Sequence, residues 1–312
     1  MKIAFAADPL AGFKIYKDST YAMMAEAARR GHSIFVFQHK DMAFEGGKVV
    51  ANFSRVILTG GGQEDWYRQE EPVAQELTGF DAILERTDPP FNMEYIYATY
   101  LLELAQQQGA RVFNKPEAIR SFNEKLAIAQ FPQYIAPTLV TADAKRVRAF
   151  HEEHRDITLK PLGGMGGAGI FRVKDDALNL GSIIETLSEN GSRTIMVQRY
   201  IPEITEGDKR ILLIGGQVVP YCLARIPQGS EIRGNLAVGG IGVAREISTR
   251  DREIGEALAP LLLKRGLLLV GLDAIGSYMT ELNVTSPTCF QEIKQQTGLM
   301  LPECLLMRWK RM

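Results

Sequence analysis

The chain has 312 residues, enough for two domains of ordinary size or for one large domain with an appended piece. Apolar residue types make up 46% of it and charged types 23%, which is typical of folded globular proteins and excludes disordered and collagen-like classes. The 36 lysines and arginines nearly balance the 37 aspartates and glutamates, giving a formal net charge of −1. This balance argues against nucleic acid or a membrane surface as a partner.

Membrane-spanning and disulfide-rich classes are also disfavoured. No run of about 18 apolar residues occurs, so no segment is expected to span a bilayer. The apolar run before Asp8 is too short for the core of a signal peptide. The cysteines, Cys222, Cys289 and Cys304, are odd in number and form no Cys-x-x-Cys pair, which predicts neither a disulfide framework nor a zinc cluster. We therefore expect a cytoplasmic protein.

The first third of the chain alternates short apolar or β-branched runs with helical patterns. Strands are predicted at residues 2–7, 33–37, 56–59, 81–85 and 111–113. Helices are predicted at residues 21–30, after the capping residues Asp18-Ser19-Thr20, and at 93–108, before Gly109. This alternation predicts an α/β domain with a mostly parallel sheet and helices on its faces.

A second unit begins near Asn123 and has a different pattern. Its predicted strands are residues 138–141, 157–160, 170–173 and 194–200, with a helix at 142–154. Strands 210–214 and 218–226 are predicted to form a hairpin, because Gly215-Gly216 supplies a two-residue turn. Helix 251–264 then precedes strands 267–274 and 278–284, which meet at the tight turn Gly276-Ser277.

The loop at residues 163–169 contains five glycines in seven residues. Positions without a Cβ let backbone amides approach an anion closely. A dinucleotide-binding fingerprint would have to open a helix, whereas this loop leads into a β-branched and aromatic run. The pattern favours a flap over nucleotide phosphates, with a flexible surface hairpin as the alternative. Lys160 just before the loop, and Lys125 by position, are candidates to bind the phosphates.

The strongest local pattern lies at residues 271–284. Asp273 and Glu281 approach each other across the predicted strand pair, and Glu281 and Asn283 share one face. Two carboxylates and an amide oxygen from apolar strands are costly to bury without a counter-ion. Oxygen ligands suit a hard cation, here Mg²⁺ with Mn²⁺ as an alternative. A half-exposed hairpin with its polar side chains in water is the other interpretation.

Residues 226–242 combine glycines, polar residues and one proline, and they predict a long mobile loop that acts as a lid. Arg210 and Arg225 lie in the strands before this loop, where a guanidinium group can clamp a carboxylate. Ion pairs with surface acids such as Asp208 or Glu203 are the alternative. No nucleophile–base arrangement occurs, so the chemistry is expected to be electrostatic.

In this order, the motifs resemble the ATP-grasp superfamily and, within it, the bacterial glutathione synthetase family. The resemblance covers nearly the whole chain, with residues 60–63 and 297–312 less typical of the family. Its most specific segments are Asp88-Pro89-Pro90-Phe91, Ile96-Tyr97-Ala98-Thr99-Tyr100, Asn114-Lys115-Pro116, Asn123-Glu124-Lys125-Leu126, Lys160-Pro161-Leu162 with the glycine loop, Asp208-Lys209-Arg210, and residues 221–237 and 280–288.

The resemblance implies an N-terminal parallel-sheet α/β domain, the pre-ATP-grasp domain, over residues 1–122 and an ATP-grasp domain over residues 123–312. The second domain would divide into a lid subdomain, residues 123–200, and a C-terminal subdomain, residues 201–312, with the magnesium site and the mobile loop. ATP would bind between the sheets of the two subdomains. A homo-oligomer, either a tetramer or a dimer, is also expected.

Residue roles follow from the resemblance by position. The residues implied for ATP are Lys125, Lys160, Gly164, Gly166, Gly167, Gln198, Arg199, Tyr200, Ile201 and Asp208. The residues implied for Mg²⁺ are Asp273, Glu281 and Asn283. Arg210, Arg225 and Lys160 would be catalytic, and the substrate would contact Asp18, Ser19, Arg86, Arg225, Ser286 and Thr288.

The family reaction joins γ-glutamylcysteine to glycine with conversion of ATP to ADP and phosphate. The resemblance therefore implies γ-glutamylcysteine, glycine and ATP as ligands and an acyl phosphate as the intermediate. An ATP-grasp ligase for another acid and amine is the alternative within enzymes. A nucleotide-binding module without catalysis is the alternative outside them, and the set formed by Asp273, Glu281 and Asn283 speaks against it.

Overall fold

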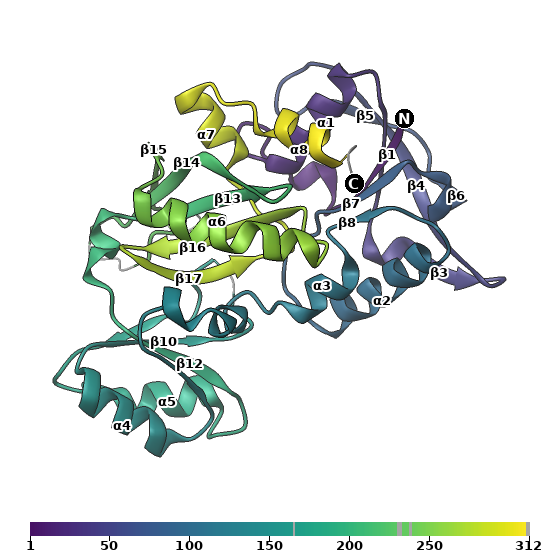
Figure 1. Ribbon diagram of the computed structural model, residues 1–312. Coiled ribbons are helices and arrows are strands. Elements are labelled where there is room, and N and C mark those ends of the chain that lie inside the picture. The colour runs from purple at the N-terminus through teal and green to yellow at the C-terminus, as the bar shows by residue number, and fades with distance from the viewer. Residues whose placement is uncertain (165, 230–232, 237–238, 310–312) are drawn as a thin grey trace.

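The computed structural model describes residues 1–164, 166–229, 233–236 and 239–309. Within these residues the strands form three sheets, one in the N-terminal domain and two in the remainder of the chain. Figure 1 shows the four-stranded sheet and its two helices as a separate lobe at the lower left, below the five-stranded sheet. No helix in these ranges is long and apolar enough to cross a lipid bilayer.

The N-terminal domain has a parallel centre, as predicted. Its parallel strands are β1 (Lys2–Ala6), β2 (Ser33–Phe37), β7 (Ala82–Glu85) and β8 (Val112–Phe113). Its helices are α1 (Ser19–Arg29), α2 (Met93–Gln107) and α3 (Pro116–Ser121). Alternation along β1 sends Ile3 and Phe5 into a core with α1, and Ala4 and Ala6 into a core with α2. The sheet is therefore covered on both faces.

An antiparallel extension of this sheet was not predicted. It consists of β3 (Met42–Glu45), β4 (Lys48–Leu58), β5 (Tyr67–Gln69) and β6 (Val73–Glu76). Strand β4 pairs antiparallel with β2, and the other three strands pair with β4. Gly46 and Gly47, with φ of 57° and 79°, make the two-residue turn between β3 and β4. The prediction of a strand at residues 56–59 covered only the end of β4.

The four-stranded sheet has the order β11-β10-β12-β9 and carries two helices. Its elements are β9 (Thr138–Thr141), α4 (Ala144–His154), β10 (Ile157–Pro161), β11 (Phe171–Val173), α5 (Leu180–Ser188) and β12 (Ile195–Arg199). Val147, Leu159, Ile184 and Val197 belong to a core of its own. The short helix at Leu126–Gln130 was predicted to belong to this lobe. Its Ala127 and Ile128 lie instead in the core of the five-stranded sheet.

The five-stranded sheet is antiparallel, in the order β15-β14-β13-β16-β17. Its elements are β13 (Asp208–Ile214), β14 (Gln217–Ile226), β15 (Ile241–Glu246), α6 (Thr249–Lys264), β16 (Leu269–Ile275) and β17 (Tyr278–Asn283). Both predicted hairpins are present, with Gly215 and Gly216 at φ of 56° and 75°. Strand β15 was not predicted: Ile241 and Gly242 pair with β14, although they were assigned to the mobile loop.

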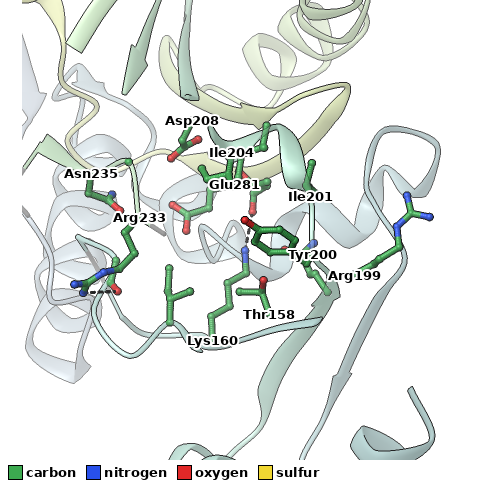
Figure 2. Close-up of a pocket in the computed structure, with 16 residues that line it drawn as sticks. Thr158, Lys160, Arg199, Tyr200, Ile201, Ile204, Asp208, Arg233, Asn235 and Glu281 are labelled. Atoms are coloured by element: carbon green, nitrogen blue, oxygen red, sulfur yellow. Dashed lines mark hydrogen bonds between the residues drawn. The ribbon is translucent and has the colours of Figure 1, made fainter. Parts of the chain in front are cut away.

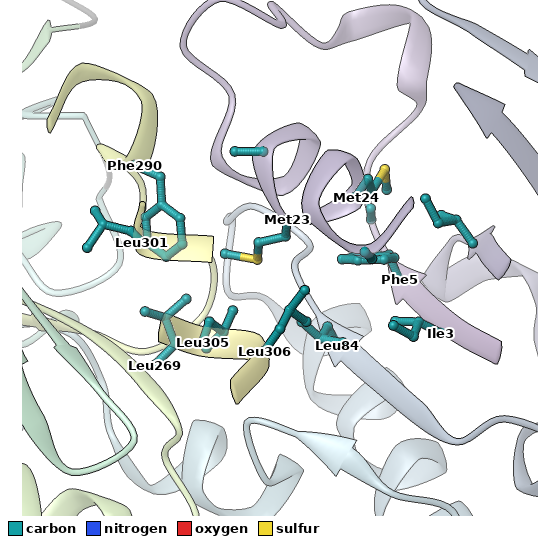
Figure 3. Close-up of a cluster of buried hydrophobic side chains, with 14 of the residues drawn as sticks. Ile3, Phe5, Met23, Met24, Leu84, Leu269, Phe290, Leu301, Leu305 and Leu306 are labelled. Carbon is teal, nitrogen blue, oxygen red and sulfur yellow. The ribbon is translucent and has the colours of Figure 1, made fainter. Parts of the chain in front are cut away.

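The C-terminal helices α7 (Phe290–Thr297) and α8 (Leu301–Trp309) join the two domains. Figure 3 shows Leu305 and Leu306 of α8 close to Met23, and Phe290 near Leu301. These side chains share one buried cluster with β1 and with the face of the five-stranded sheet opposite α6. The cluster fixes the N-terminal domain against that sheet and leaves the four-stranded lobe outside it.

Candidate active site between the sheets

Two cavities meet where the four-stranded lobe, the five-stranded sheet and the loop after β7 come together. The first is bordered by Lys160 and Tyr200 of the lobe and by Asp208 of the sheet. The second is bordered by residues of all three parts. Glu281 and Asn235 border both cavities, so a ligand group in one is within reach of a group in the other.

The first cavity combines an apolar end with polar groups. Ile201, Ile204 and Ile275 line it together with Gln198 and Tyr200. A nucleobase requires such a surface, apolar on its faces and able to form hydrogen bonds at its edge. Figure 2 shows Tyr200 next to Lys160 and Thr158, and Asp208 and Glu281 across the cavity.

The Tyr200 ring is stacked against an arginine side chain. The Arg172 guanidinium carbon lies 3.5 Å from the centre of the Tyr200 ring. Arg172 in turn donates two hydrogen bonds to Asp156, at 2.9 Å from Nε and 2.6 Å from Nη2. This stack fixes the orientation of the ring that borders the cavity.

The residues predicted for ATP lie around the junction of the cavities, though not all line the same one. The first cavity is lined by Lys160, Gly167, Gln198, Arg199, Tyr200, Ile201 and Asp208. Gly164 and Gly166 line the second. The Arg199 side chain points away from the other labelled residues in Figure 2, and its Nη2 donates to the Tyr278 hydroxyl at 3.2 Å. Arg199 therefore contributes its backbone rather than its charge.

Two buried lysines converge on Glu281. Lys125 Nζ lies 3.4 Å from Glu281 Oε1 and donates to the Gly164 carbonyl at 2.5 Å. Lys160 Nζ donates to the Thr280 carbonyl at 3.3 Å, and Lys160 is 5% exposed. Burial lowers the pKa of Lys160 to about 8, although the Glu281 carboxylate opposes this effect. Phosphate oxygens would add anionic partners for both ammonium groups, beside the Glu281 carboxylate that already pairs with Lys125.

The glycine loop joins β10 and β11, in the strand–loop–strand arrangement that the sequence predicted, and the two strands pair antiparallel. A Cβ on Gly167 would lie 2.6 Å from Asn235 Oδ1, and Arg233 Nη1 donates to the Gly167 carbonyl at 3.3 Å. The glycine loop thus touches the segment predicted to act as a lid. Of that segment, residues 230–232 and 237–238 lie outside the described residues.

The acidic hairpin forms and brings Asp273 and Glu281 together, as predicted; a register shift between Asp273 and Ala274 places the two residues directly opposite each other in β16 and β17. Asp273 is enclosed by donors. Arg210 binds it through Nε and, at 2.9 Å, through Nη2, and Arg225 Nη2 lies 2.8 Å from Oδ2. Burial works against its ionisation, but the two guanidinium groups outweigh burial and lower the pKa of Asp273 to about 2.

Asp208 extends this charge network to the first cavity. Its Oδ2 accepts from Arg225 Nη2 at 2.5 Å, while its buried Oδ1 has no hydrogen-bond partner among the described residues. Burial raises the pKa of Asp208 to about 6 against the opposing charge of Arg225. The ion pair between Arg225 and Asp208 that the sequence left as an alternative is therefore real, but it is buried.

Oxygen atoms at this hairpin fit a hard cation in part. Asn283 Nδ2 donates to the Gly271 carbonyl at 3.3 Å and to Asp273 Oδ2 at 3.2 Å, which leaves its carbonyl oxygen for a ligand. Glu281 adds a carboxylate. Asp273 would first have to release an arginine. Within the described ranges no three His, Cys, Asp or Glu side chains form a metal cluster, so ligand oxygens would complete the shell.

The residues predicted for the substrate fall into two groups. Arg210, Arg225, Ser286 and Thr288 line the second cavity. Asp18, Ser19 and Arg86 do not border either cavity and have structural partners. Asp18 caps α1 by accepting from Tyr21 N at 2.7 Å, and Ser19 Oγ accepts from Phe290 N at 3.1 Å.

Arg86 is buried between the domains. Its Nε donates to Thr20 Oγ1 at 3.0 Å and its Nη2 to the Pro287 carbonyl at 2.9 Å. Burial lowers the pKa of the guanidinium group, although nearby acids oppose this. Arg86 therefore ties the loop after β7 to the segment that carries Ser286 and Thr288.

Several lining residues were not predicted. Glu124, Asp88 and Cys289 border the second cavity, and Arg233 and Asn235 border the first. Burial raises the pKa of Glu124, and the Glu281 carboxylate adds to the effect. Asp88 and Glu124 lie in segments that carry the family resemblance. Those segments could have indicated both residues, but the resemblance assigned no function to their side chains.

Comparison with known proteins agrees with this geometry. Residues 1–120 match the model of the prokaryotic glutathione synthetase N-terminal domain, and residues 124–298 match that of the prokaryotic glutathione synthetase ATP-grasp domain. The chain is 62% identical over 298 residues to a glutathione synthetase of Ralstonia nicotianae, covering 96% of this chain and 92% of that one. It is 58% identical over 301 residues to one of Neisseria meningitidis serogroup B, covering 96% and 94%.

Solved structures support the fold. The D-cycloserine synthetase DcsG aligns over 99% of both chains with a TM-score of 0.69 at 15% identity. The ATP-grasp ligase PsnB in complex with a minimal precursor aligns over 98% of this chain and 99% of that one, with a TM-score of 0.61 at 18% identity. With both family models and these relatives covering nearly all of its length, the chain belongs to the prokaryotic glutathione synthetase family of ATP-grasp ligases.

Proposed function

We propose that this ATP-dependent ligase joins the cysteine carboxyl group of γ-glutamylcysteine to the amino group of glycine. The observation that carries the proposal is the pair of cavities that share Glu281 and Asn235. The first has the apolar walls and buried lysine that a nucleotide requires, and the second has Arg210 and Arg225 for a carboxylate. Transfer between two ligands needs this adjacency.

The reaction proceeds in two displacements. A carboxylate oxygen of the dipeptide attacks the γ-phosphorus of ATP, the bond to the bridging oxygen breaks, and ADP leaves. The glycine amine then attacks the carbonyl carbon of the acyl phosphate, loses a proton, and expels inorganic phosphate. Lys125 and Lys160 screen the charge on the transferred phosphoryl group, and Arg210 and Arg225 orient the carboxylate. The loop that contains Arg233 and Asn235 excludes water from the acyl phosphate.

A divalent cation, Mg²⁺ with Mn²⁺ as an alternative, fits the hairpin. Glu281 and Asn283 would hold it, with Asp273 joining them once an arginine contact is released. Such an ion, when bound, neutralises phosphate charge and polarises the phosphorus–oxygen bond. Glu281 stands at the junction of the cavities, where this effect would be greatest.

The location and the oligomeric state of the protein are also proposed. The cysteines Cys222, Cys289 and Cys304 are all unpaired thiols, which supports a reducing, cytoplasmic location. We also expect a tetramer or a dimer of this chain, which sedimentation of the purified protein would test.

The test of function is ADP release by the purified full-length chain with ATP and Mg²⁺. We expect release to require both γ-glutamylcysteine and glycine, and mass spectrometry to identify the product as their condensate. Release that ignores either compound would contradict the proposal. Turnover with another amine in place of glycine, at higher kcat/KM, would instead favour a ligase with a different substrate pair.

A further inference from the structure

The loop after β7 is the part of the N-terminal domain that borders the second cavity, through Asp88 and Pro89. Side chains of the same domain fix its backbone. Glu85 Oε1 accepts from Thr87 N at 2.8 Å, and Asp8 Oδ2 accepts from Asp88 N at 2.9 Å. His39 Nε2 lies 2.9 Å from the other Glu85 oxygen and holds that carboxylate in place. The position of Asp88 is therefore set before any ligand arrives.

The same loop is tied to the opposite wall. The buried Arg86 guanidinium donates to the Pro287 carbonyl at 2.9 Å, and the residues on either side of Pro287, Ser286 and Thr288, line the cavity with Asp88. Asp88 thus faces a site whose other polar groups include Arg210 and Arg225. A ligand bound there meets cationic groups from the five-stranded sheet and an anionic group from the N-terminal domain.

Among the residues that the structure describes, three carboxylates border this cavity, and two of them already have partners. Glu124 accepts from Thr285 Oγ1 at 2.9 Å, and Glu281 lies 3.4 Å from Lys125 Nζ. The exposed Asp88 carboxylate forms no hydrogen bond or ion pair within the described part of the chain. The carboxylates of Asp8 and Asp18 lie within its electrostatic range. The Arg86 guanidinium also interacts with the charge of Asp88. The three carboxylates of Asp8, Asp18 and Asp88 outnumber this one guanidinium, so this end of the cavity favours a cation.

We propose that Asp88 binds the α-ammonium group of the γ-glutamyl residue and so selects acceptors of phosphate that carry a free amino group at that end. This inference rests on the proposed function. The dipeptide has its reacting carboxylate at one end and its ammonium group at the other. Arg210 and Arg225 orient the first, and the N-terminal domain supplies the anion for the second.

The direct test compares γ-glutamylcysteine with glutarylcysteine, which lacks only the α-amino group. With ATP, Mg²⁺ and saturating glycine, we expect the unaltered enzyme to have a KM about 10- to 100-fold higher for glutarylcysteine, because a charge-assisted bond is lost. The Asp88→Asn variant should raise the KM for γ-glutamylcysteine by a similar factor and leave that for glutarylcysteine within about threefold. The kcat with γ-glutamylcysteine and the KM for glycine should change little.

The matched control is Glu94→Gln, which removes one exposed carboxylate in the first turn of α2, outside the cavity wall. It should retain the preference for γ-glutamylcysteine. Three results would overturn the role of Asp88. The unaltered enzyme could have the same KM for both dipeptides, the D88N variant could raise the KM for both dipeptides equally, or it could raise the KM for glycine instead. Absence of ADP release with γ-glutamylcysteine in the unaltered enzyme would overturn the proposed function as well.

Discussion

Asp273 is expected to stabilise the fold as well as to serve the active site, and the variant Asp273→Asn separates the two roles. The Asp273 side chain is 3% exposed and those of Arg210 and Arg225 are 8% and 6% exposed. The carboxylate accepts hydrogen bonds from both guanidinium groups and from Asn283. An amide in its place has one oxygen and no charge, so two buried cations lose their shared anion.

Breaking one side of a buried, hydrogen-bonded ion pair costs about 3–5 kcal/mol, and we expect the lower end because Asp208 still pairs with Arg225. The sign of the pH dependence follows from the lowered pKa of Asp273. Its contribution is present above the ordinary value of 3.8 and is lost as the pH falls through about 2. The unaltered protein should lose this contribution over that window, and the Asn variant should not.

The assay is urea unfolding followed by circular dichroism, with ADP release measured on the same samples. Glu281→Gln is the control, because Glu281 is 21% exposed and its ion pair with Lys125 spans 3.4 Å. It should abolish turnover with a change in unfolding free energy of about 1 kcal/mol or less. If Asp273→Asn were no less stable than Glu281→Gln, the buried network would not have the role we assign to it.

Three more outcomes are expected. Since burial lowers the pKa of Lys160 to about 8, ATP binding measured by calorimetry should weaken about tenfold from pH 7 to pH 9, and a flat profile would exclude Lys160 as a phosphate ligand. Arg172→Ala should raise the Kd for ATP about three- to tenfold by freeing Tyr200, with the KM for glycine unchanged; equal effects on both would indicate a general structural defect. Leu306→Ala should lower the unfolding free energy of the N-terminal domain, measured in urea, by about 2–5 kcal/mol. If the variant showed faster amide hydrogen exchange in α8 alone, and not in β1 and α1, the shared core would be contradicted.

Local patterns predicted the elements around the active site well. The paired glycines at 215–216 marked one hairpin and Gly276 the other, because their positive φ values match two-residue turns between strands. In the second hairpin a register shift between Asp273 and Ala274, which the turn length does not predict, places Asp273 opposite Glu281. These features depend on residues near one another in sequence.

The remainder depends on distant contacts. Strand β15 pairs with β14 across the lid segment, and its only sequence signal, the alternating Ile241 and Val243, is too short to distinguish it from the loop before it. Arg86 was assigned to the substrate by position, yet its guanidinium reaches Pro287, about two hundred residues further along the chain. The ion pairs of Asp273 with Arg210 and Arg225 likewise join residues that are far apart in the sequence. A sequence pattern shows that charged residues are present but not which of them neutralise one another.

The shared cluster around α8 has a consequence for how the enzyme opens and for how it can be engineered. Figure 3 shows side chains from both ends of the chain interlocked, so separating the N-terminal domain from the five-stranded sheet would expose leucines and methionines to water. The four-stranded lobe has a core of its own and meets the five-stranded sheet through a smaller apolar contact, in which Met196 is buried in the core of that sheet and Val140 and Leu162 pack against it. Admission of nucleotide should thus be a hinged swing of that lobe alone, and a chimaera that exchanges the N-terminal domain must exchange α8 with it.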